Sequence, residues 1–365
     1  MQSNPRILIA GGGTGGHIIP ALAIAHELKT RHGAEMLFVG TARGLESRLV
    51  PQAGYRLELI RVGQLNRVSL ATRLRTLVDL PLSLMQCVRL LRSFRPDVVI
   101  GVGGYASGPV MGAAILMRIP TLAFEPNAVP GLANRLIGAR VRGAAVNFEP
   151  AARYFRNAQI TGIPVRGEFF RLAPRPAGAA PHLLVFGGSQ GARVLNTMMP
   201  KIAAALLSAV PGLTILHQAG ARHAESTLAA YRESGAAADR WQVEAFLDDM
   251  PRRFEAADLV LARSGASTVA ELAAGGKPAL LVPFALAADD HQRRNAEVMV
   301  QAGAARVLLE AELTPEQLQG TLIDLLGDPS RLSQMAAEAR KLAHPDAAER
   351  IACMAMALAG GGSGA

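Results

Sequence analysis

The sequence has few cysteines and no long apolar run. Its two cysteines, Cys87 and Cys353, are far apart and lie in no metal-ligand or redox spacing, which indicates reduced structural thiols. No stretch approaches the roughly 18 apolar residues of a transmembrane helix, and the N-terminus MQSNPRILIA lacks the pattern of a signal peptide. No Asp-x-Asp motif occurs, so the sequence requires no metal and no other cofactor. We therefore expect a cytoplasmic globular protein that crosses no bilayer.

The positive charge is concentrated in the first half of the chain. Residues 1–163 hold 19 of the 38 Lys+Arg but only 8 of the 29 Asp+Glu, which leaves 19 basic against 21 acidic residues for the remainder. Nucleic acid, an anionic membrane surface, a phosphorylated substrate or solubility alone would each explain this excess.

The two halves of the chain begin in the same way. A predicted strand at 6–10 precedes the glycine-rich stretch 11–17, and a predicted strand at 182–186 precedes the glycine-rich stretch 187–192. Further strands alternate with helices in both halves, which predicts an α/β fold of two Rossmann-like, doubly wound parallel-sheet domains. The Pro-, Ala- and Gly-rich residues 164–181 indicate the connection between them.

We expect the first domain at 1–163 and the second at 164–345. A C-terminal helix at 346–359 then packs back on the first domain, and a disordered tail follows at 360–365. The first helix is expected to begin near Pro20, because proline suits a first helical turn.

Polar loops follow several strands of the first half. His17 follows the first glycine loop, and the stretches 103–109 and 125–131 follow two later strands. Because the carboxyl ends of parallel strands share one edge of a sheet, these residues should line a cleft. The glycine loop formally fits a dinucleotide pattern, but the second strand ends in Gly40-Thr41 with no acidic residue for an adenosine ribose. A nicotinamide- or flavin-dependent oxidoreductase is therefore disfavoured.

The stretch 258–295 has the features of a nucleotide-sugar site. Arg263, Ser264 and Gly265 fall at the carboxyl end of a buried strand, where open α/β sheets bind ligands, and the free N–H groups of the following helix suit a phosphate. One turn later Glu271 offers acceptors for both hydroxyls of a ribose, and the loop 289–292 offers donors and acceptors to a sugar. Taken alone, Glu271 would equally be a solvated helix residue.

Six motifs, in order, give a specific resemblance. They are GGGTGGH (11–17), GVGGYASGP (101–109), EPNAVPGLAN (125–134), TGIPVR (161–166), FGGSQGAR (186–193) and the block 258–296. Together they resemble the MurG family of bacterial N-acetylglucosaminyltransferases, which have the GT-B fold of two domains facing across a cleft. Pro126 and His291 depart from the residues expected in many members, where glutamine is common.

The resemblance implies that N-acetylglucosamine moves from UDP to the 4-hydroxyl of the muramoyl sugar of lipid I, with inversion, which forms lipid II for peptidoglycan. It implies His17 as the base, with Glu125 and Tyr105 behind it; His17 would otherwise be only a helix-capping group. Uracil would lie near Leu247, and Arg166 would assist the leaving group or merely pair with Glu168. The implied donor-binding residues are Thr14, Gly15, Gly16, Asn127, Arg166, Ser189, Leu247, Ser264, Gly265, Ala266, Ser267, Thr268, Glu271, His291 and Gln292.

A basic, amphipathic helix is predicted at 70–95. From Arg61 to Arg95 the chain holds seven arginines and one acidic residue, Asp79, beside an apolar stripe. This pattern is typical either of a helix packed on its own sheet or of one that binds an anionic membrane surface. The implied lipid acceptor favours docking on the cytoplasmic face of the inner membrane, near cell-wall synthesis or division proteins. The predicted membrane residues are Arg73, Arg75, Leu77 and Arg89.

Three other functions stay open. The disfavoured oxidoreductase would show nicotinamide binding. UDP-N-acetylglucosamine 2-epimerases share this architecture and donor, and they would release N-acetylmannosamine without an acceptor. A nucleic-acid-binding protein would use the basic first half, but with 4% aromatic residues the chain has little to stack on bases, so no nucleic acid partner is expected.

Overall fold

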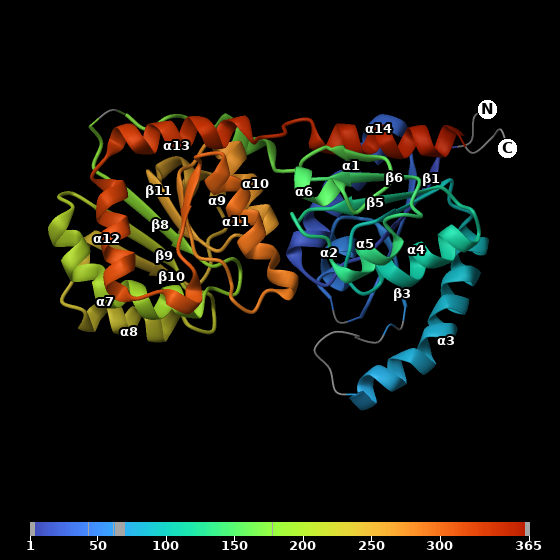
Figure 1. Ribbon diagram of the computed structural model, residues 1–365, viewed down its shortest axis with the longest axis horizontal. Coiled ribbons are helices and arrows are strands. Elements are labelled where there is room, and N and C mark those ends of the chain that lie inside the picture. Colours follow the sequence, from blue (N-terminus) through green and yellow to red (C-terminus); the bar gives the residue numbers. More distant parts are fainter. Residues whose placement is uncertain (1–3, 43, 61, 63–69, 177, 362–365) are drawn as a thin grey trace. The chain divides into compact units, whose positions relative to one another are not determined.

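The structure, a computed structural model, describes residues 4–42, 44–60, 62, 70–176 and 178–361, and only the backbone of 70–81. The chain divides into two compact units, each a parallel sheet covered by helices (Figure 1). Unit 1 is Met1–Pro164 with Asp346–Ala365, and unit 2 is Val165–Pro345.

Unit 1 is built on a seven-stranded sheet in the order β3-β2-β1-β4-β5-β6-β7. Its strands are β1 (Arg6–Ala10), β2 (Glu35–Gly40), β3 (Arg56–Leu59), β4 (Val98–Gly101), β5 (Thr121–Glu125), β6 (Gly143–Val146) and β7 (Ala158–Ile160). Its helices are α1 (Gly15–His32), α2 (Glu46–Gln52), α3 (Leu70–Phe94), α4 (Ser107–Leu116), α5 (Leu132–Ile137), α6 (Glu149–Ala152) and α14 (Ala347–Gly360). The central strands are apolar and buried along their length, as expected where helices cover both faces of a parallel sheet.

Unit 2 repeats this plan with six parallel strands in the order β10-β9-β8-β11-β12-β13. Its strands are β8 (His182–Phe186), β9 (Thr214–Gln218), β10 (Trp241–Glu244), β11 (Leu259–Ala262), β12 (Ala279–Leu281) and β13 (Ala305–Val307). Its α-helices are α7 (Arg193–Ala209), α8 (Ala224–Glu233), α9 (Met250–Ala256), α10 (Ala266–Gly275), α11 (His291–Gln301), α12 (Pro315–Leu326) and α13 (Pro329–Lys341).

The strand order fixes where ligands bind in each unit. In unit 1 the order reverses between β1 and β4, and in unit 2 between β8 and β11. Open α/β sheets bind ligands outside the carboxyl ends of the strands at such a switch point. The loops that follow these four strands are therefore the first place to look for a site.

The last helix belongs to unit 1. Figure 1 shows α14 beside α1, and it buries Ile351, Ala352 and Ala355. An ion pair between Arg31 Nη1 and Glu349 Oε1, 2.9 Å long, joins the two helices at the surface.

The predicted doubly wound α/β architecture is confirmed, and the predicted strands lie within two residues of those observed. The expected start of the first helix is wrong: α1 begins at Gly15 and contains Pro20. The expectation rested on the proline, which suits a first helical turn, but Pro20 lies inside α1 and the helix begins five residues earlier. The tail predicted at 360–365 lies outside the described residues from 362 onward, and Gly360 ends α14.

Candidate active site

Two glycine loops interlock at the switch point of unit 1. The N–H of Gly12, after β1, donates to the carbonyl of Gly103, after β4, over 3.2 Å. A Cβ on Gly11 would collide with that same carbonyl, and a Cβ on Gly104 would collide with the carbonyl of Gly12. Glycine is therefore required here by close backbone approach as well as by positive φ.

His17 lies directly beside these loops. It is the third residue of α1, and its N–H donates to the carbonyl of Thr14. Its half-buried imidazole packs on Gly103, where a Cβ would come within 2.9 Å of Cε1. The predicted residues Thr14–Gly16 precede it, and Tyr105, 46% exposed, follows the second loop. The structure thus brings His17 together with the backbone of both loops.

Glu46 holds the first glycine loop in place, and sequence reasoning missed it. This carboxylate is buried and accepts from the N–H of Gly13 over 2.7 Å and from the N–H and hydroxyl of Thr41. A Cβ on Gly12 would collide with it. The sequence gives little signal, because Glu46 begins a short helix and its partner Gly13 lies 33 residues earlier.

Glu125 is fully engaged by its own loop. The carboxylate is 2% exposed and accepts from the N–H and the side-chain amide of Asn127, from the N–H of Gly131 and from Nδ2 of Asn134. Burial raises its pKa, and these hydrogen bonds oppose the rise. With four donors on two oxygens, the carboxylate is built to shape the loop 126–131 rather than to collect a proton.

Apart from Arg166, which precedes β8, the predicted donor residues of unit 2 lie after the carboxyl ends of its strands. Ser189, exposed, follows β8 in a glycine loop, and Leu247, 4% exposed, follows β10. Its neighbour Phe246 is 54% exposed, so an aromatic ring stands next to the position predicted for uracil. Residues Ser264–Thr268 follow β11 and open α10.

The start of α10 offers unused donors. Gly265 is the N-cap and provides no side-chain cap. Among the described residues, the buried hydroxyl of Ser267 has no hydrogen-bond partner. Ser264 differs, because its hydroxyl donates to the carbonyl of Gln292 over 2.8 Å and so ties α10 to α11. An open helix N-terminus with an unsatisfied buried hydroxyl suits a phosphate.

Glu271 is mostly buried on α10, so its interpretation as a solvated helix residue is wrong. Burial raises its pKa to about 7, and the guanidinium of Arg166 opposes the rise. Arg166 is exposed, and its guanidinium lies 5.3 Å from the ring centre of Phe169. A buried carboxylate with a raised pKa near an exposed cation is typical of a binding site rather than of a structural ion pair.

The loop before α11 orients Gln292 and His291. Oε1 of Gln292 accepts from the N–H of Phe284 over 3.0 Å, so its NH₂ group remains to donate to a ligand. Nδ1 of His291 lies 2.7 Å from the carbonyl of Ala288, which can only accept. Nδ1 therefore carries the proton, and Nε2 is the acceptor when the ring is neutral.

The buried side chain of Arg263 holds the loop between β12 and α11 in place. The guanidinium is 8% exposed and donates to the carbonyls of Val282 and Pro283 and to Oε2 of Glu310 over 2.8 Å. The same Oε2 accepts from the N–H of Ala285. The position of Arg263 at the carboxyl end of β11 predicts a ligand-facing residue, but the side chain turns inward. Its partner lies 47 residues away, which sequence spacing does not reveal.

We expect Glu310→Gln to weaken binding of a nucleotide-sugar without weakening that of its nucleotide. Glutamine keeps the shape but loses the charge that holds Arg263 and the N–H of Ala285, so the loop carrying Gln292 loosens. The KM for the sugar donor should rise about tenfold, the scale of one charge-assisted hydrogen bond. UDP affinity, measured by calorimetry, should stay within about twofold. Equal losses for both ligands would contradict a role confined to the sugar.

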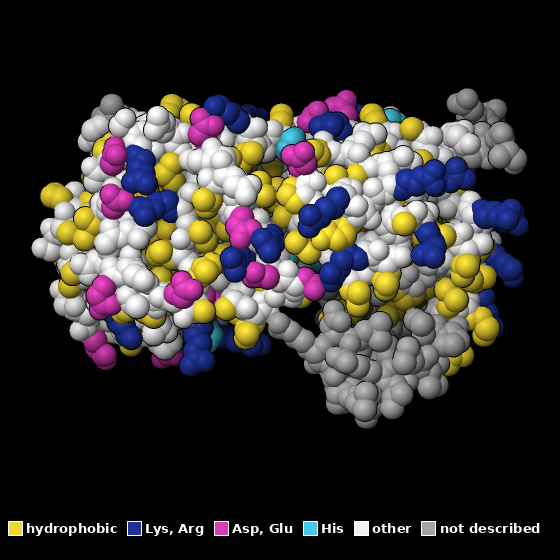
Figure 2. Space-filling model, in the orientation of Figure 1, with side chains coloured by type: hydrophobic (Ala, Val, Ile, Leu, Met, Phe, Trp, Pro, Cys, Tyr) yellow, Lys and Arg dark blue, Asp and Glu magenta, His cyan; other side chains and the backbone are white. Residues whose placement is uncertain are grey.

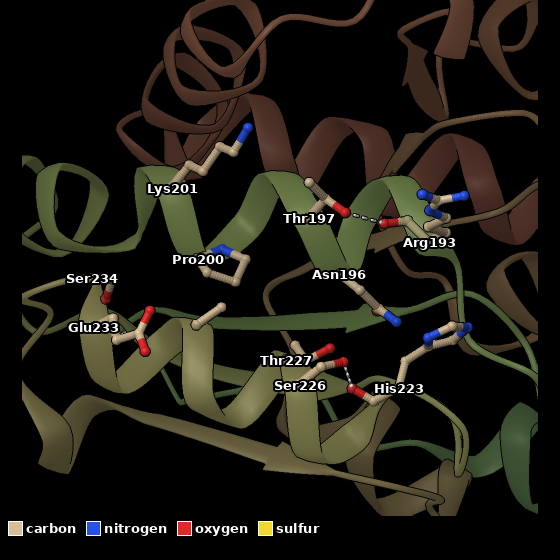
Figure 3. A pocket seen from close by; sticks show the side chains of 11 residues that line it. Arg193, Asn196, Thr197, Pro200, Lys201, His223, Ser226, Thr227, Glu233 and Ser234 are labelled. Carbon is tan, nitrogen blue, oxygen red and sulfur yellow. Dashed lines mark hydrogen bonds between the residues drawn. The ribbon is translucent and has the colours of Figure 1, made fainter.

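A groove of about 460 Å³ lies elsewhere in unit 2, between α7 and α8 (Figure 3). Arg193, Asn196 and Lys201 line it from α7, and Ser226 and Thr227 from α8. None of the predicted donor residues lines this groove. Within the described residues no helix is long and apolar enough to span a membrane, and no cluster of metal-ligating side chains occurs.

Two Rossmann-like units with polar residues at the carboxyl edges of their sheets are the architecture of GT-B glycosyltransferases. Comparison with known proteins places the chain within that class. Residues 7–146 match the glycosyltransferase family 28 N-terminal domain, and residues 182–351 match the glycosyltransferase family 28 C-terminal domain.

Individual relatives narrow the assignment from this class to one family. The UDP-N-acetylglucosamine–N-acetylmuramyl-(pentapeptide) pyrophosphoryl-undecaprenol N-acetylglucosamine transferase of Anaeromyxobacter dehalogenans (strain 2CP-C) is 46% identical over 358 residues, 97% of this chain and 93% of the relative. The crystal structure of Acinetobacter baumannii MurG matches with a TM-score of 0.81 and 30% identity, covering 97% of this chain and 99% of that one. A UDP-bound structure of S. aureus MnaA, 14% identical with a TM-score of 0.67 over 95% and 94% of the two chains, shares the fold alone.

The chain therefore belongs to glycosyltransferase family 28 and, within it, to the MurG family of N-acetylglucosaminyltransferases.

Proposed function

We propose that this protein transfers N-acetylglucosamine from UDP-N-acetylglucosamine to the 4-hydroxyl of the N-acetylmuramoyl sugar of undecaprenyl-pyrophosphoryl-MurNAc-pentapeptide, a step of peptidoglycan synthesis. The bond from the anomeric carbon to the UDP oxygen breaks and a bond to the acceptor oxygen forms on the opposite face, with inversion. UDP leaves as an anion, and the acceptor hydroxyl loses its proton to a base. The identity to the named transferases supports both substrates.

The observation that carries the donor assignment is the combination on α10. The open N-terminus with the unpartnered Ser267 hydroxyl suits a phosphate, and Glu271, one turn later, suits the two ribose hydroxyls. Phe246 and Leu247 border the place for uracil, and the NH₂ of Gln292 and Nε2 of His291 are left for the sugar. Backbone and hydroxyl donors of this kind stabilise a leaving diphosphate because they are preorganised before the charge develops.

Unit 1 supplies the acceptor chemistry in this proposal. His17, fixed against Gly103, takes the proton of the attacking hydroxyl. Glu46 and Glu125 are positioning residues: Glu46 holds the loop after β1, and Glu125 holds the loop after β5, which carries Asn127. Tyr105 presents its hydroxyl from the loop after β4. Thr14, Gly15 and Gly16 contribute the backbone of the glycine loop.

An undecaprenyl-linked acceptor stays in its bilayer, so the protein must work at a membrane surface. We place it as a peripheral protein on the cytoplasmic face of the inner membrane, docked through unit 1. The described end of α3 exposes Leu82 and Met85, at 63% and 50%, and α4 exposes Leu116 at 72%. Figure 2 shows hydrophobic and basic side chains interspersed over α3, α4 and α5. Arg89 is exposed on α3, whereas the side chains of Arg73, Arg75 and Leu77 lie outside the described residues.

The triple variant Arg73→Glu/Arg75→Glu/Arg89→Glu should bind vesicles containing phosphatidylglycerol at least tenfold more weakly than the parent. Each basic residue near an anionic leaflet contributes about 1 kcal/mol, and reversal replaces attraction by repulsion. Co-sedimentation at low salt measures the effect, and binding of the parent should fall as salt rises.

A matched control reverses three exposed arginines of unit 2, Arg222, Arg232 and Arg252, with the same change in net charge. If both triple variants lose binding equally, only the overall charge matters. If the α3 variant folds and binds like the parent, the helix is simply packed on its own sheet and the docking surface lies elsewhere.

The proposal is tested by incubating the protein with labelled UDP-N-acetylglucosamine and a soluble lipid I analogue. A labelled disaccharide that forms only when both substrates are present supports transfer. Release of N-acetylmannosamine without acceptor would instead support the 2-epimerase alternative.

A further inference from the structure

A chain of buried hydrogen bonds lies beneath the glycine loop of unit 2. His217, on β9, is 1% exposed. Its Nδ1 lies 3.1 Å from the hydroxyl of Tyr231 on α8, and its Nε2 lies 3.0 Å from Oδ1 of Asn196 on α7. Nδ2 of Asn196 donates to the carbonyl of Ala219 over 2.8 Å. Three side chains from three elements thus form one series of hydrogen bonds, which ends on the backbone carbonyl directly after β9.

The direction of this chain is fixed by its last member. Because a carbonyl only accepts, the amide of Asn196 must present its NH₂ to Ala219 and its oxygen to His217. Nε2 of His217 therefore carries the proton, and Nδ1 accepts from the hydroxyl of Tyr231. Burial lowers the pKa of His217 to about 3, so the ring stays neutral at any working pH. The hydroxyl of Tyr231, the ring of His217 and the amide of Asn196 thus each donate one hydrogen bond to the next member of the series.

The carbonyl it holds is packed against the glycine loop after β8. A Cβ on Gly191 would collide with the carbonyl of Ala219, and a Cβ on Gly220 would collide with that of Gln190. Next to this contact, Nε2 of Gln218 donates to the carbonyl of Gly188 over 3.0 Å. The turn after β9 is therefore the surface on which the loop 187–191 rests.

We propose that Tyr231, His217 and Asn196 are positioning residues for the donor diphosphate: they fix the turn after β9, and the turn fixes the loop that presents Ser189. This inference rests on the proposed function and extends it: Ser189 is one of the expected donor-binding residues, and its loop is taken to contact the diphosphate. Figure 3 shows the side chain of Asn196 projecting from α7 toward the start of α8. Apolar side chains could fill such a core position with equal stability, so the polar chain is best explained by what it orients.

The same pair of strands supplies a matched control at its opposite end. Nδ1 of His182 lies 2.7 Å from the hydroxyl of Thr214, and the two residues pair in register at the amino ends of β8 and β9. This contact is also a part-buried histidine–hydroxyl hydrogen bond, but it is remote from the loops. Thr214→Val removes it as Tyr231→Phe removes the hydroxyl from the proposed chain.

The experiment compares Tyr231→Phe, Asn196→Leu and Thr214→Val for binding of UDP and of uridine, with thermal unfolding measured alongside. We expect UDP to bind about threefold more weakly to Tyr231→Phe, which loses one hydrogen bond. Asn196→Leu loses two hydrogen bonds, and its affinity for UDP should fall about tenfold or more. Uridine, which lacks the phosphates, should bind all variants like the parent. Thr214→Val should lower the unfolding temperature without changing UDP affinity.

Two results would overturn the inference. One is UDP affinity of Tyr231→Phe and Asn196→Leu equal to the parent; the other is an equal loss for UDP and uridine, which a merely structural role produces. If Asn196→Leu does not fold, Tyr231→Phe decides alone. A parent protein that fails to bind UDP overturns the proposed function and this inference with it, whereas a parent that binds alongside unaffected variants overturns the inference only.

Discussion

Replacing His17 by alanine is expected to lower the turnover number about 100-fold or more while leaving UDP affinity nearly unchanged. A positioned general base typically contributes that much to the rate, and His17 belongs to unit 1, whereas the residues proposed for uracil, ribose and phosphate belong to unit 2. The imidazole is held against Gly103 by the glycine loop and by Glu46, so its loss removes a fixed base rather than a mobile one.

The control for this variant is His26→Ala, which removes an exposed histidine from the same helix. Turnover at saturating acceptor and calorimetric titration with UDP measure the two effects separately. A turnover number within a few-fold of the parent would move the base elsewhere. A parallel loss of UDP affinity would show that His17 supports donor binding instead.

Replacing Glu271 by alanine is expected to weaken donor binding by about 2 kcal/mol, or roughly 30-fold, while the fold survives. A carboxylate that accepts from both ribose hydroxyls makes two charge-assisted hydrogen bonds, which lie at the strong end of the scale. Glu233→Ala, which removes an exposed acid from α8, is the control. Unchanged UDP affinity in the Glu271 variant would remove this residue from the site.

The same residue predicts how donor binding depends on pH. With a pKa of about 7, Glu271 is largely protonated at pH 6 and largely ionised at pH 8. Since the ionised form is the better acceptor, UDP-N-acetylglucosamine should bind up to about tenfold more weakly at pH 6 than at pH 8. The sugar nucleotide is the right probe, because it has no terminal phosphate that titrates near pH 6. The dependence should disappear in Glu271→Gln.

The stability of the unliganded fold should change in the opposite sense. Because the folded pKa of Glu271 lies above its usual value of 4.5, folding takes up a proton between about pH 4.5 and pH 7. This group therefore favours the folded state at low pH, and its contribution is lost as pH rises through 7. A site that is least stable where it binds best is consistent with function rather than with a structural carboxylate.

Much of this fold could be predicted because its strongest signals are local. The apolar strands β1, β4 and β8 and the glycine loops after β1 and β8 are visible as short patterns, and their order along the chain specifies parallel sheets. The start of α1 could not be predicted, because the two glycines of its first turn have low helix propensity and hide the helical pattern that follows.

The supporting groups of the site could not be predicted for a different reason. Arg263 pairs with Glu310, and Glu46 caps a loop that precedes it by 33 residues. Such pairs form only when the parallel register brings distant loops to one edge. Residue type alone therefore suggested that Arg263 and Glu125 face a ligand, whereas each is occupied in shaping its own loop.

Inverting transfer to lipid I can be followed directly through the anomeric configuration of the transferred sugar, by proton NMR. In UDP-N-acetylglucosamine the sugar is α-linked. With a lipid I analogue present, we expect a β-linkage to the 4-hydroxyl of the muramoyl sugar, one UDP released per disaccharide, and no product from an acceptor that lacks this hydroxyl. Consumption of the donor without acceptor, with N-acetylmannosamine as the sugar product, or an α-linked disaccharide, would contradict it.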